Sequence, residues 1–301
     1  MDAQTLRAMQ GLAQEVWRIA PTTVNVDGMV GEIAWAFAAP QGAGPQRSHR
    51  LWRERGQVIA WGVIFPPEMR RVTAERMEMS KAGLVWQTHP ERPELLDDVL
   101  AWFAAETPGA PRQTFTRSAN TDAIQRIERH GYSRDHGAPW DLMNMRDLVD
   151  IEGPLLPPGY RLTTMREVRD VTKRVEAHRA AWEPSSLTEE KYAAVMATWP
   201  YRDDLDFVVE APDGSLASSA LGWYDEQNRV GEFEPVGTHP AHRRLGLAQA
   251  VMLFGMERFR AAGATHAIVG CRGDAAYPVP KLVYESIGFR EISRDVPFVH
   301  Q

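Results

Sequence analysis

The chain has 301 residues, of which 44% are hydrophobic and 25% are charged. These values are ordinary for a folded globular protein, so extensive disorder is excluded, and the length suits one large domain or two smaller ones. The formal net charge is −6, and each half of the chain carries 17 basic residues against 19 or 21 acidic ones. A module that binds nucleic acid through its phosphates is therefore not expected.

A single cysteine, Cys271, excludes an internal disulfide and a zinc site built from cysteines. The first 17 residues lack the basic and apolar blocks of a signal peptide, and no run approaches the roughly 18 apolar residues of a membrane span. We therefore expect a cytoplasmic protein that holds no metal and enters no membrane.

Residues 150–159 interrupt the chain near its midpoint, with three prolines and two glycines in ten positions. Such a stretch disfavours both helix and central strand. We predict one domain over 1–149, a linker over 150–158 and a second domain over 159–301.

The two halves resemble one another in sequence. A Thr-His-Pro triplet at 88–90 recurs at 238–240, an offset of 150, and the segment 124–132 parallels 281–289, an offset of 157. Two similarities in the same order at nearly equal offsets favour an old duplication.

The second half alternates between helical and extended patterns. In chain order we predict a helical region over 166–198 broken at 183–186, strands over 206–210, 216–224 and 229–238, a helix over 246–262 that ends at Gly263, a strand over 266–271, a helix over 281–286 and a strand over 290–298. Hairpins followed by a strand–helix–strand unit predict an α+β fold and not a doubly wound sheet.

The segment 232–250 is where we expect chemistry, because a strand runs into a tight loop and then into a helix. The unpaired N–H groups of a helix N-terminus accept phosphates. Gly246 and Ala248 remove bulk where a pyrophosphate would approach the backbone, and Arg243 and Arg244 add positive charge.

The Thr-His-Pro triplet, the Arg-x-x-Gly-x-Ala motif at 243–248, the later strand and the Tyr-Glu-Ser-Ile-Gly-Phe segment at 284–289 follow in order. This pattern resembles the acyl-CoA signature of the GNAT acetyltransferase superfamily. The resemblance covers 159–298 well and 20–148 faintly, and the tandem arrangement resembles that of mycothiol synthase and related two-domain proteins. It implies two domains, each a mixed and mostly antiparallel sheet flanked by helices.

The resemblance also implies that acetyl-CoA is a co-substrate and assigns residues to it. The backbone at Val236, Gly237 and Thr238 would pair with the pantetheine arm. The pyrophosphate would be cradled by Arg243, Arg244, Leu245, Gly246, Leu247 and Ala248.

Three residues are candidates for catalysis. Glu232 stands where many family members carry the general base, and a partly buried carboxylate can have its pKa raised towards neutrality. Glu234 lies two residues on and, by strand alternation, on the same face; it is a second candidate for the base, a group that holds a cationic substrate, or a solvated residue. Tyr284 stands where the family often places the acid that protonates the thiolate, or it packs against Phe289.

The acceptor side is less clearly marked in the sequence. The interruption at 182–186 falls where family members often bind the acceptor, and the candidate residues are His178, Trp182, Trp223 and Tyr224, although aromatic residues in such a domain also serve as core. Many family members carry an Asn before the last helix; here the loop 273–281 holds two prolines, and Asp274 or Tyr277 would have to replace its contact.

The first half lacks the features that fit a pyrophosphate. Aligned on Thr-His-Pro, the positions of Arg243, Gly246 and Ala248 are taken by Pro93, Leu96 and Asp98, and aligned on the later repeat Ile127 replaces Tyr284. We therefore predict that the first domain has lost CoA binding.

The function implied is N-acetylation of a small amine by direct attack within a ternary complex, by a monomer or homodimer. The alternative is an acyl-CoA-binding sensor or interaction module without catalysis. The sequence does not specify the acceptor or the acyl chain length.

Overall fold

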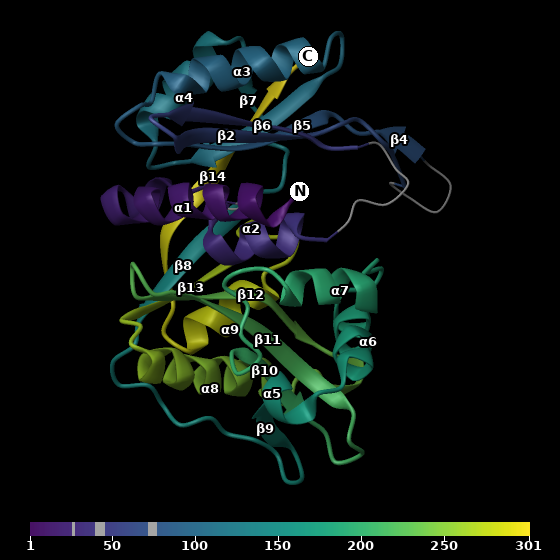
Figure 1. Cartoon of the computed structure of the whole chain (residues 1–301). Coiled ribbons are helices and arrows are strands. Elements are labelled where there is room, and N and C mark those ends of the chain that lie inside the picture. Colours follow the sequence, from purple (N-terminus) through teal and green to yellow (C-terminus); the bar gives the residue numbers. More distant parts are fainter. Residues whose placement is uncertain (26–27, 40–45, 72–76) are drawn as a thin grey trace. The chain divides into compact units, whose positions relative to one another are not determined.

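The computed structural model describes residues 1–25, 28–39, 46–71 and 77–301, which form two compact units (Figure 1). Unit C comprises Met1–Ala3, Val30–Pro40 and Met143–Ile292. Unit N comprises Gln4–Met29, Gln41–Leu142 and Ser293–Gln301. Each unit thus contains a segment from the other half of the sequence.

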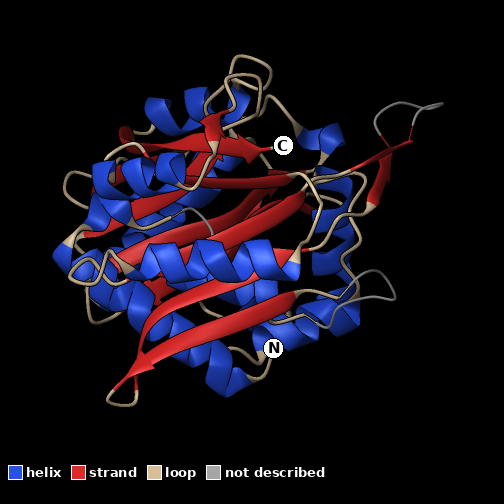
Figure 2. Ribbon diagram, turned by 90° about the horizontal axis from the view of Figure 1, so that it is seen from above, coloured by secondary structure: helices blue, strands red, loops and turns tan. Residues whose placement is uncertain are grey.

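Unit C is an α+β structure in which helices flank a sheet with the strand order β8-β13-β12-β11-β10-β9. Figure 2 shows the helices and strands of the chain by colour. Its elements are α2 (Val30–Phe37), β8 (Asp141–Asp147), β9 (Arg161–Thr164), α5 (Met165–Val168), α6 (Val171–Ala181), α7 (Glu189–Met196), β10 (Asp206–Glu210), β11 (Leu216–Asp225), β12 (Val230–Thr238), η3 (Pro240–His242), α8 (Leu247–Ala262), β13 (His266–Arg272), α9 (Val279–Ser286) and the start of β14 (Arg290–His300). β12 and β13 are parallel, whereas β9 to β12 pair in antiparallel fashion.

Unit N repeats this plan with the strand order β1-β2-β5-β6-β14. Its elements are α1 (Ala3–Ile19), η1 (Pro21–Thr23), β1 (Ser48–Glu54), β2 (Gln57–Phe65), β3 (Met69–Arg71), β4 (Met77–Met79), β5 (Ala82–Thr88), α3 (Leu95–Glu106), β6 (Arg112–Arg117), α4 (Thr121–Arg129), β7 (Ser133–Arg134) and the end of β14. β5 and β6 are the parallel pair here. Both units therefore confirm the predicted fold class of mixed, mostly antiparallel sheets flanked by helices.

The repeated sequence segments fold into repeated local structures. His89 and His239 follow β5 and β12, and the ring Nδ1 of each accepts the backbone N–H two residues on, at 3.2 Å in both cases. α4 and α9 are followed by Gly131 and Gly288, with φ of +83° and +85°. A duplication accounts for this agreement, because both pairs occur at equivalent points of the two units.

The exchange of segments between the units is reciprocal. Residues 143–147 of β8 precede the Pro/Gly-rich stretch, yet they belong to unit C, where β8 lies next to β13. The last residues of the chain, from Ser293, belong to unit N, where β14 pairs with β6. The division into 1–149 and 159–301 remains a prediction about domains, and the compact units cross it in both directions.

One face of the unit C sheet packs on α8. Phe207, Phe233 and Phe259 are fully buried there, with ring centroids 4.9–6.2 Å apart. Gly231 is required at this interface, because a Cβ on it would lie 2.3 Å from the Phe259 ring. The helix is apolar on more than one side, as its sequence predicts, and Gly263 ends it with φ of +105°.

α6 and α7 are anchored by a buried ion pair. The Arg174 side chain of α6 and the Asp206 side chain of β10 are both fully buried, and Arg174 Nε donates to Asp206 Oδ1 at 3.0 Å. The Tyr192 hydroxyl of α7 donates to the other carboxylate oxygen. Because a buried charge needs partners, this network fixes α6 and α7 to the strand.

Candidate functional site

A fork between β12 and β13 marks the candidate site in unit C. The two strands pair in parallel from Val230 to Phe233, opposite His266 to Val269. β12 then continues to Thr238, still paired with β11, while β13 continues to Arg272. The fork exposes one edge of β12 over Val236, Gly237 and Thr238, the residues expected to pair with a pantetheine arm.

The loop after β12 leads into the N-terminus of α8. Arg244 and Gly246 both adopt positive φ, at +64° and +75°. Gly246 is exposed, and α8 has no acidic residue in its first turn. The side chain of Arg243 holds the loop, donating to the carbonyls of Thr238 and Ala181 at 3.3 Å. The N–H groups in the first turn of α8 lie beside two arginines and no acidic residue of that turn. They can therefore bind an anion such as a pyrophosphate.

Glu232 is buried on the face of β12 opposite α8, with 3% of the residue exposed. Its carboxylate accepts two backbone N–H groups at the N-terminus of α2: Gly31 donates to Oε2 at 2.8 Å and Glu32 donates to Oε1 at 3.0 Å. α2 comes from the other half of the sequence and packs on β11 and β12 within unit C. A helix N-terminus favours negative charge, so this contact stabilises the carboxylate form.

Burial and hydrogen bonding act on the Glu232 pKa in opposite directions. Burial raises the pKa to about 7, and the charge of Asp225 adds to that effect, while the two N–H groups lower it. Burial prevails because removing a carboxylate from water disfavours its charged form more strongly than two hydrogen bonds restore it here. The group is therefore close to half ionised near neutral pH.

Gly31 allows α2 to approach the carboxylate this closely. A Cβ at this position would lie 2.2 Å from Cδ1 of Trp223 and 2.8 Å from Oε2 of Glu232. Neither distance is tolerable, so any side chain at this position would displace the helix or the indole.

The second carboxylate, Glu234, has different neighbours. β12 contains a bulge there, because Phe233 pairs with Gly222 and Val236 with Ala220, which leaves two residues of β12 opposite one of β11. We expected Glu232 and Glu234 to share a face because side chains alternate along a strand. The bulge interrupts that alternation between the two residues.

Tyr284 of α9 is buried next to Phe289, with ring centroids 6.1 Å apart. Burial raises the pKa of its phenol strongly, and the charge of Glu234 raises it further. The Glu234 carboxylate is therefore near Tyr284, whereas Glu232 contacts α2. The phenol is therefore protonated at neutral pH, and its raised pKa makes loss of the proton harder than for an exposed tyrosine.

Three of the four predicted acceptor-side residues lie near β12. Trp182 is 48% exposed, and its indole Nε1 would be 2.8 Å from a Cβ on Gly237. His178 stacks on Trp182 at 6.2 Å, and burial lowers the pKa of His178 to about 4, helped by the charge of Arg174. Trp223 pairs with Glu232 across the strands, and its Nε1 donates to the Glu234 carbonyl at 2.7 Å.

The fourth residue, Tyr224, lies in the cluster that packs on α8, on the other face of the sheet from Trp223. In the loop before α9, Asp274 binds Arg272 with an Nε–Oδ2 distance of 2.6 Å, and Tyr277 is 51% exposed.

The sequence did not reveal α2 or its Trp35 as part of this site. Trp35 lies 5.2 Å from His178 between ring centroids, at an interplanar angle of 57°. The usable signal was the Gly-Glu pair at 31–32 in the first turn of a short apolar helix, but nothing local links it to a strand 200 residues away. Among the described residues there is no group of His, Cys, Asp and Glu side chains suited to hold a metal, and none of their helices has the length and apolarity to cross a bilayer.

Residues 172–289, all within unit C, match the model of the acetyltransferase (GNAT) family. A mycothiol acetyltransferase of Streptomyces griseus subsp. griseus is 28% identical over 145 residues, which make up 47% of this chain and 46% of that protein. The alignment thus spans about half the length of this curated relative. Together these similarities support an acyltransferase.

Solved structures share the fold along the whole chain. A GCN5-related N-acetyltransferase from Sphaerobacter thermophilus superposes with a TM-score of 0.61 at 18% identity, covering 100% of this chain and 93% of that one. A tandem GNAT protein from the clavulanic acid biosynthesis pathway superposes with a TM-score of 0.62 at 15% identity, covering 99% and 95%. At such identities the likeness establishes a tandem GNAT fold, as the sequence resemblance suggested.

Proposed function

We propose that the protein transfers an acetyl group from acetyl-CoA to a small amine, using unit C as the catalytic part. The observation that carries the proposal is the position of Glu232, a buried carboxylate with a pKa near 7 on the strand that forks from β13. A carboxylate with that pKa is suited to accept a proton from an ammonium ion at neutral pH.

The residues present fit acetyl-CoA at both ends. The N-terminus of α8, with Gly246 in the left-handed region and Arg243 and Arg244 beside it, suits the pyrophosphate. The edge of β12 over Val236–Thr238 offers backbone groups to the amides of pantetheine. Bound in this way, acetyl-CoA would supply an activated thioester carbonyl at the fork.

The chemistry assigned to the chain consists of three proton transfers. The amine arrives as an ammonium ion and passes a proton to Glu232, directly or through water, before its nitrogen forms a bond to the thioester carbon. The carbon–sulfur bond then breaks as Tyr284 protonates the departing thiolate, and the former amine nitrogen returns a proton to the Tyr284 phenolate and becomes the neutral amide. The acetylated amine and free CoA are the products, and both reactants are held at once in a ternary complex.

The acceptor is proposed to bind on the α2 and α6 side, between Trp35, His178 and Trp182. His178 is neutral at pH 7 because of its lowered pKa, so its side chain does not repel a cationic acceptor. The relative named as a mycothiol acetyltransferase is aligned over only about half its length with this chain, so the acceptor class is limited here to a small amine.

A direct test is to measure free thiol released from acetyl-CoA in the presence of a panel of primary amines. We expect release that depends on both the amine and the intact chain. Binding of acetyl-CoA without thiol release by any amine, including diamines and amino sugars, would instead favour an acyl-CoA-binding module without catalysis.

A further inference from the structure

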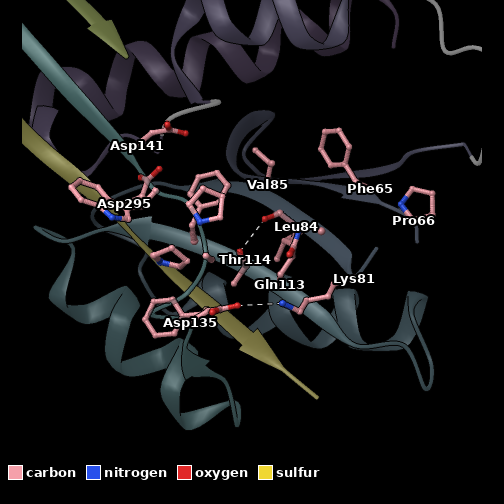
Figure 3. A pocket seen from close by; sticks show the side chains of 17 residues that line it. Phe65, Pro66, Lys81, Leu84, Val85, Gln113, Thr114, Asp135, Asp141 and Asp295 are labelled. Atoms are coloured by element: carbon pink, nitrogen blue, oxygen red, sulfur yellow. Dashed lines mark hydrogen bonds and ion pairs between the residues drawn. The ribbon is translucent and has the colours of Figure 1, made fainter. Parts of the chain in front are cut away.

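The sheet of unit N also contains a fork between its two parallel strands. β5 and β6 pair from Ala82 to Leu84, opposite Arg112 to Thr114. Beyond that point β5 remains paired with β2 and β6 with β14, so the two strands separate. At the apex of the fork the Thr114 hydroxyl donates to the Leu84 carbonyl at 2.9 Å, and both residues also line a cavity of about 300 Å³ (Figure 3). The edge of β5 beyond Leu84 therefore faces the fork.

A segment from an earlier part of the chain occupies this fork. η1 contacts β6, and the buried residues Val24 and Asn25 follow η1. Arg117, the last residue of β6, donates from Nε to the Val24 carbonyl at 2.9 Å. The Asn25 side chain donates from Nδ2 to the carbonyl of Trp86 in β5 at 2.7 Å. The segment is thus held by both strands of the fork.

The carbonyl that Asn25 binds is equivalent to one that is expected to bind pantetheine in unit C. Trp86 stands two residues before the Thr of the first Thr-His-Pro triplet, and Val236 stands two residues before the Thr of the second. Each lies beyond the last parallel pair of its strand. In unit N this carbonyl already accepts a hydrogen bond from the chain itself.

The same anchor extends almost to the start of α2. Gln87 Oε1 accepts the backbone N–H of Asn25 at 3.0 Å, and both residues are buried. The N–H of Gly28 donates to the Asn25 carbonyl at 2.9 Å, and a Cβ on Gly28 would lie 3.2 Å from the same Gln87 oxygen. The chain is thus fixed at Gly28, two residues before α2 begins at Val30.

The short stretch of chain after Gly28 connects this anchor to the proposed base. The N–H groups of Gly31 and Glu32 hold the Glu232 carboxylate. Gly31 is the third residue after Gly28, and three residues of chain span at most about 10 Å. A chain fixed at Gly28 therefore limits how far the first turn of α2 can move, and its release would let the helix separate from the carboxylate.

We propose that Asn25 and Gln87 are positioning residues for Glu232, and that the fork of unit N holds the chain that enters α2. The effect on catalysis rests on the proposed role of Glu232 as the base, whereas the effect on the Glu232 carboxylate does not. The proposal assigns a role to a fork that lacks the residues for CoA.

The test removes the two side chains of the anchor separately, in the full chain. Asn25→Ala deletes the donor to the Trp86 carbonyl, and Gln87→Met deletes the acceptor of the Asn25 N–H with little change in volume. In both variants we expect amide hydrogen exchange at Gly31 and Glu32, followed by NMR, to become about tenfold faster. A lost buried hydrogen bond favours local opening of the segment that it holds.

The pKa of Glu232 supplies a second readout that does not depend on activity. It is followed by the infrared carboxyl band that is absent from Glu232→Gln. We expect it to fall by about half a pH unit in both variants, because burial holds it near 7 and a loosened helix admits water. The acidic limb of kcat/KM should move by the same amount. A lowered pKa with an unchanged pH profile would support the anchor and count against Glu232 as the base.

Thr107→Val is the matched control. Thr107 is a buried residue of unit N at the C-terminal end of α3, and its hydroxyl donates to the Phe103 carbonyl at 2.6 Å. The control also loses one buried hydrogen bond, yet it should leave both readouts unchanged. If Asn25→Ala does not fold, Gln87→Met decides alone. Parental exchange and a parental Glu232 pKa in the folded variants, or equal effects of Thr107→Val, would overturn the proposal.

Discussion

At the scale of single residues, the contact between Gly31 and Glu232 decides the properties of the proposed base. The N–H groups of α2 hold both carboxylate oxygens, while the same helix excludes the water that would otherwise keep the pKa near 4.5. Position and basicity of Glu232 thus depend on a glycine that lies far away in sequence.

The variant Gly31→Ala tests this dependence. Its Cβ would collide with Trp223, so α2 must move away and water must reach Glu232. Burial is the largest influence on the pKa, so its relief should lower the pKa from about 7, and the acidic limb of kcat/KM should move to lower pH by about one unit. The maximal rate should fall as the base weakens.

A control variant separates this effect from a general loss of structure. Gly11→Ala, whose Cβ would meet only Arg7 at 3.8 Å, should leave the profile unchanged. A Gly31→Ala enzyme with the parental pH profile would show that α2 does not tune the base.

Tyr284→Phe tests the proposed acid. The ring and its contact with Phe289 remain, so the free energy of unfolding should barely change, whereas the release of CoA should slow. An acyl donor whose thiol is more acidic should rescue the variant more than the parent, because a stable thiolate needs no proton. Equal rates for both proteins with both donors would leave Tyr284 as a packing residue.

At the scale of elements, α6 and α7 depend on the buried pair of Arg174 and Asp206. Asp206→Asn removes the charge that balances a fully buried guanidinium, so we expect a loss of about 3–5 kcal/mol in the free energy of unfolding by denaturant titration. Asp204→Asn, which breaks a more exposed pair with Arg202, should cost about 1 kcal/mol or less. Similar losses in both variants would contradict the claim that the buried pair of Arg174 and Asp206 holds α6 and α7 in place.

The elements of the second half follow closely from the sequence, because each is bounded by a strong local signal. The strand predicted over 206–210 is β10, and the helix predicted over 246–262 is α8, displaced by one residue at its start. The break at 183–186 separates α6 from α7. Proline pairs, turn residues and a C-terminal glycine mark these ends within a few positions.

Features that depend on distant partners did not follow from the sequence. The bulge at Glu234 arises from pairing with β11, and alternation along one strand cannot reveal it. The seating of α2 on Glu232 joins residues 200 positions apart. The positions of the motif could therefore be named from the sequence, whereas the environment that sets the Glu232 pKa could not.

At the scale of the whole molecule, the two units share a plan but differ at the helix that would receive a pyrophosphate. α3 carries Asp97 and Asp98 in its first turn, and Leu96 is buried in the core, whereas α8 has Gly246 before it and no acid in its first turn. The N-terminus of α3 therefore repels an anion, whereas the N-terminus of α8 favours one.

Calorimetry with acetyl-CoA should therefore find one site per chain. Gly246→Glu should weaken it severely, because φ of +75° strains any side chain and the new charge faces the pyrophosphate. Asp98→Asn in unit N should leave the binding unchanged. Two sites of comparable affinity would contradict the assignment of CoA to unit C alone.

The central claim is that Glu232 accepts the proton of the amine, and it is tested most directly by the rate of thiol release in Glu232→Gln beside Glu234→Gln. We predict that Glu232→Gln lowers the rate about 10²–10⁴-fold at neutral pH with acetyl-CoA affinity nearly intact, and that the defect shrinks as the pH approaches the pKa of the acceptor amine. Glu234→Gln should retain most of the activity. A Glu232→Gln enzyme with the parental rate at pH 7 would contradict the account, and a large loss in Glu234→Gln alone would assign the base to that residue instead.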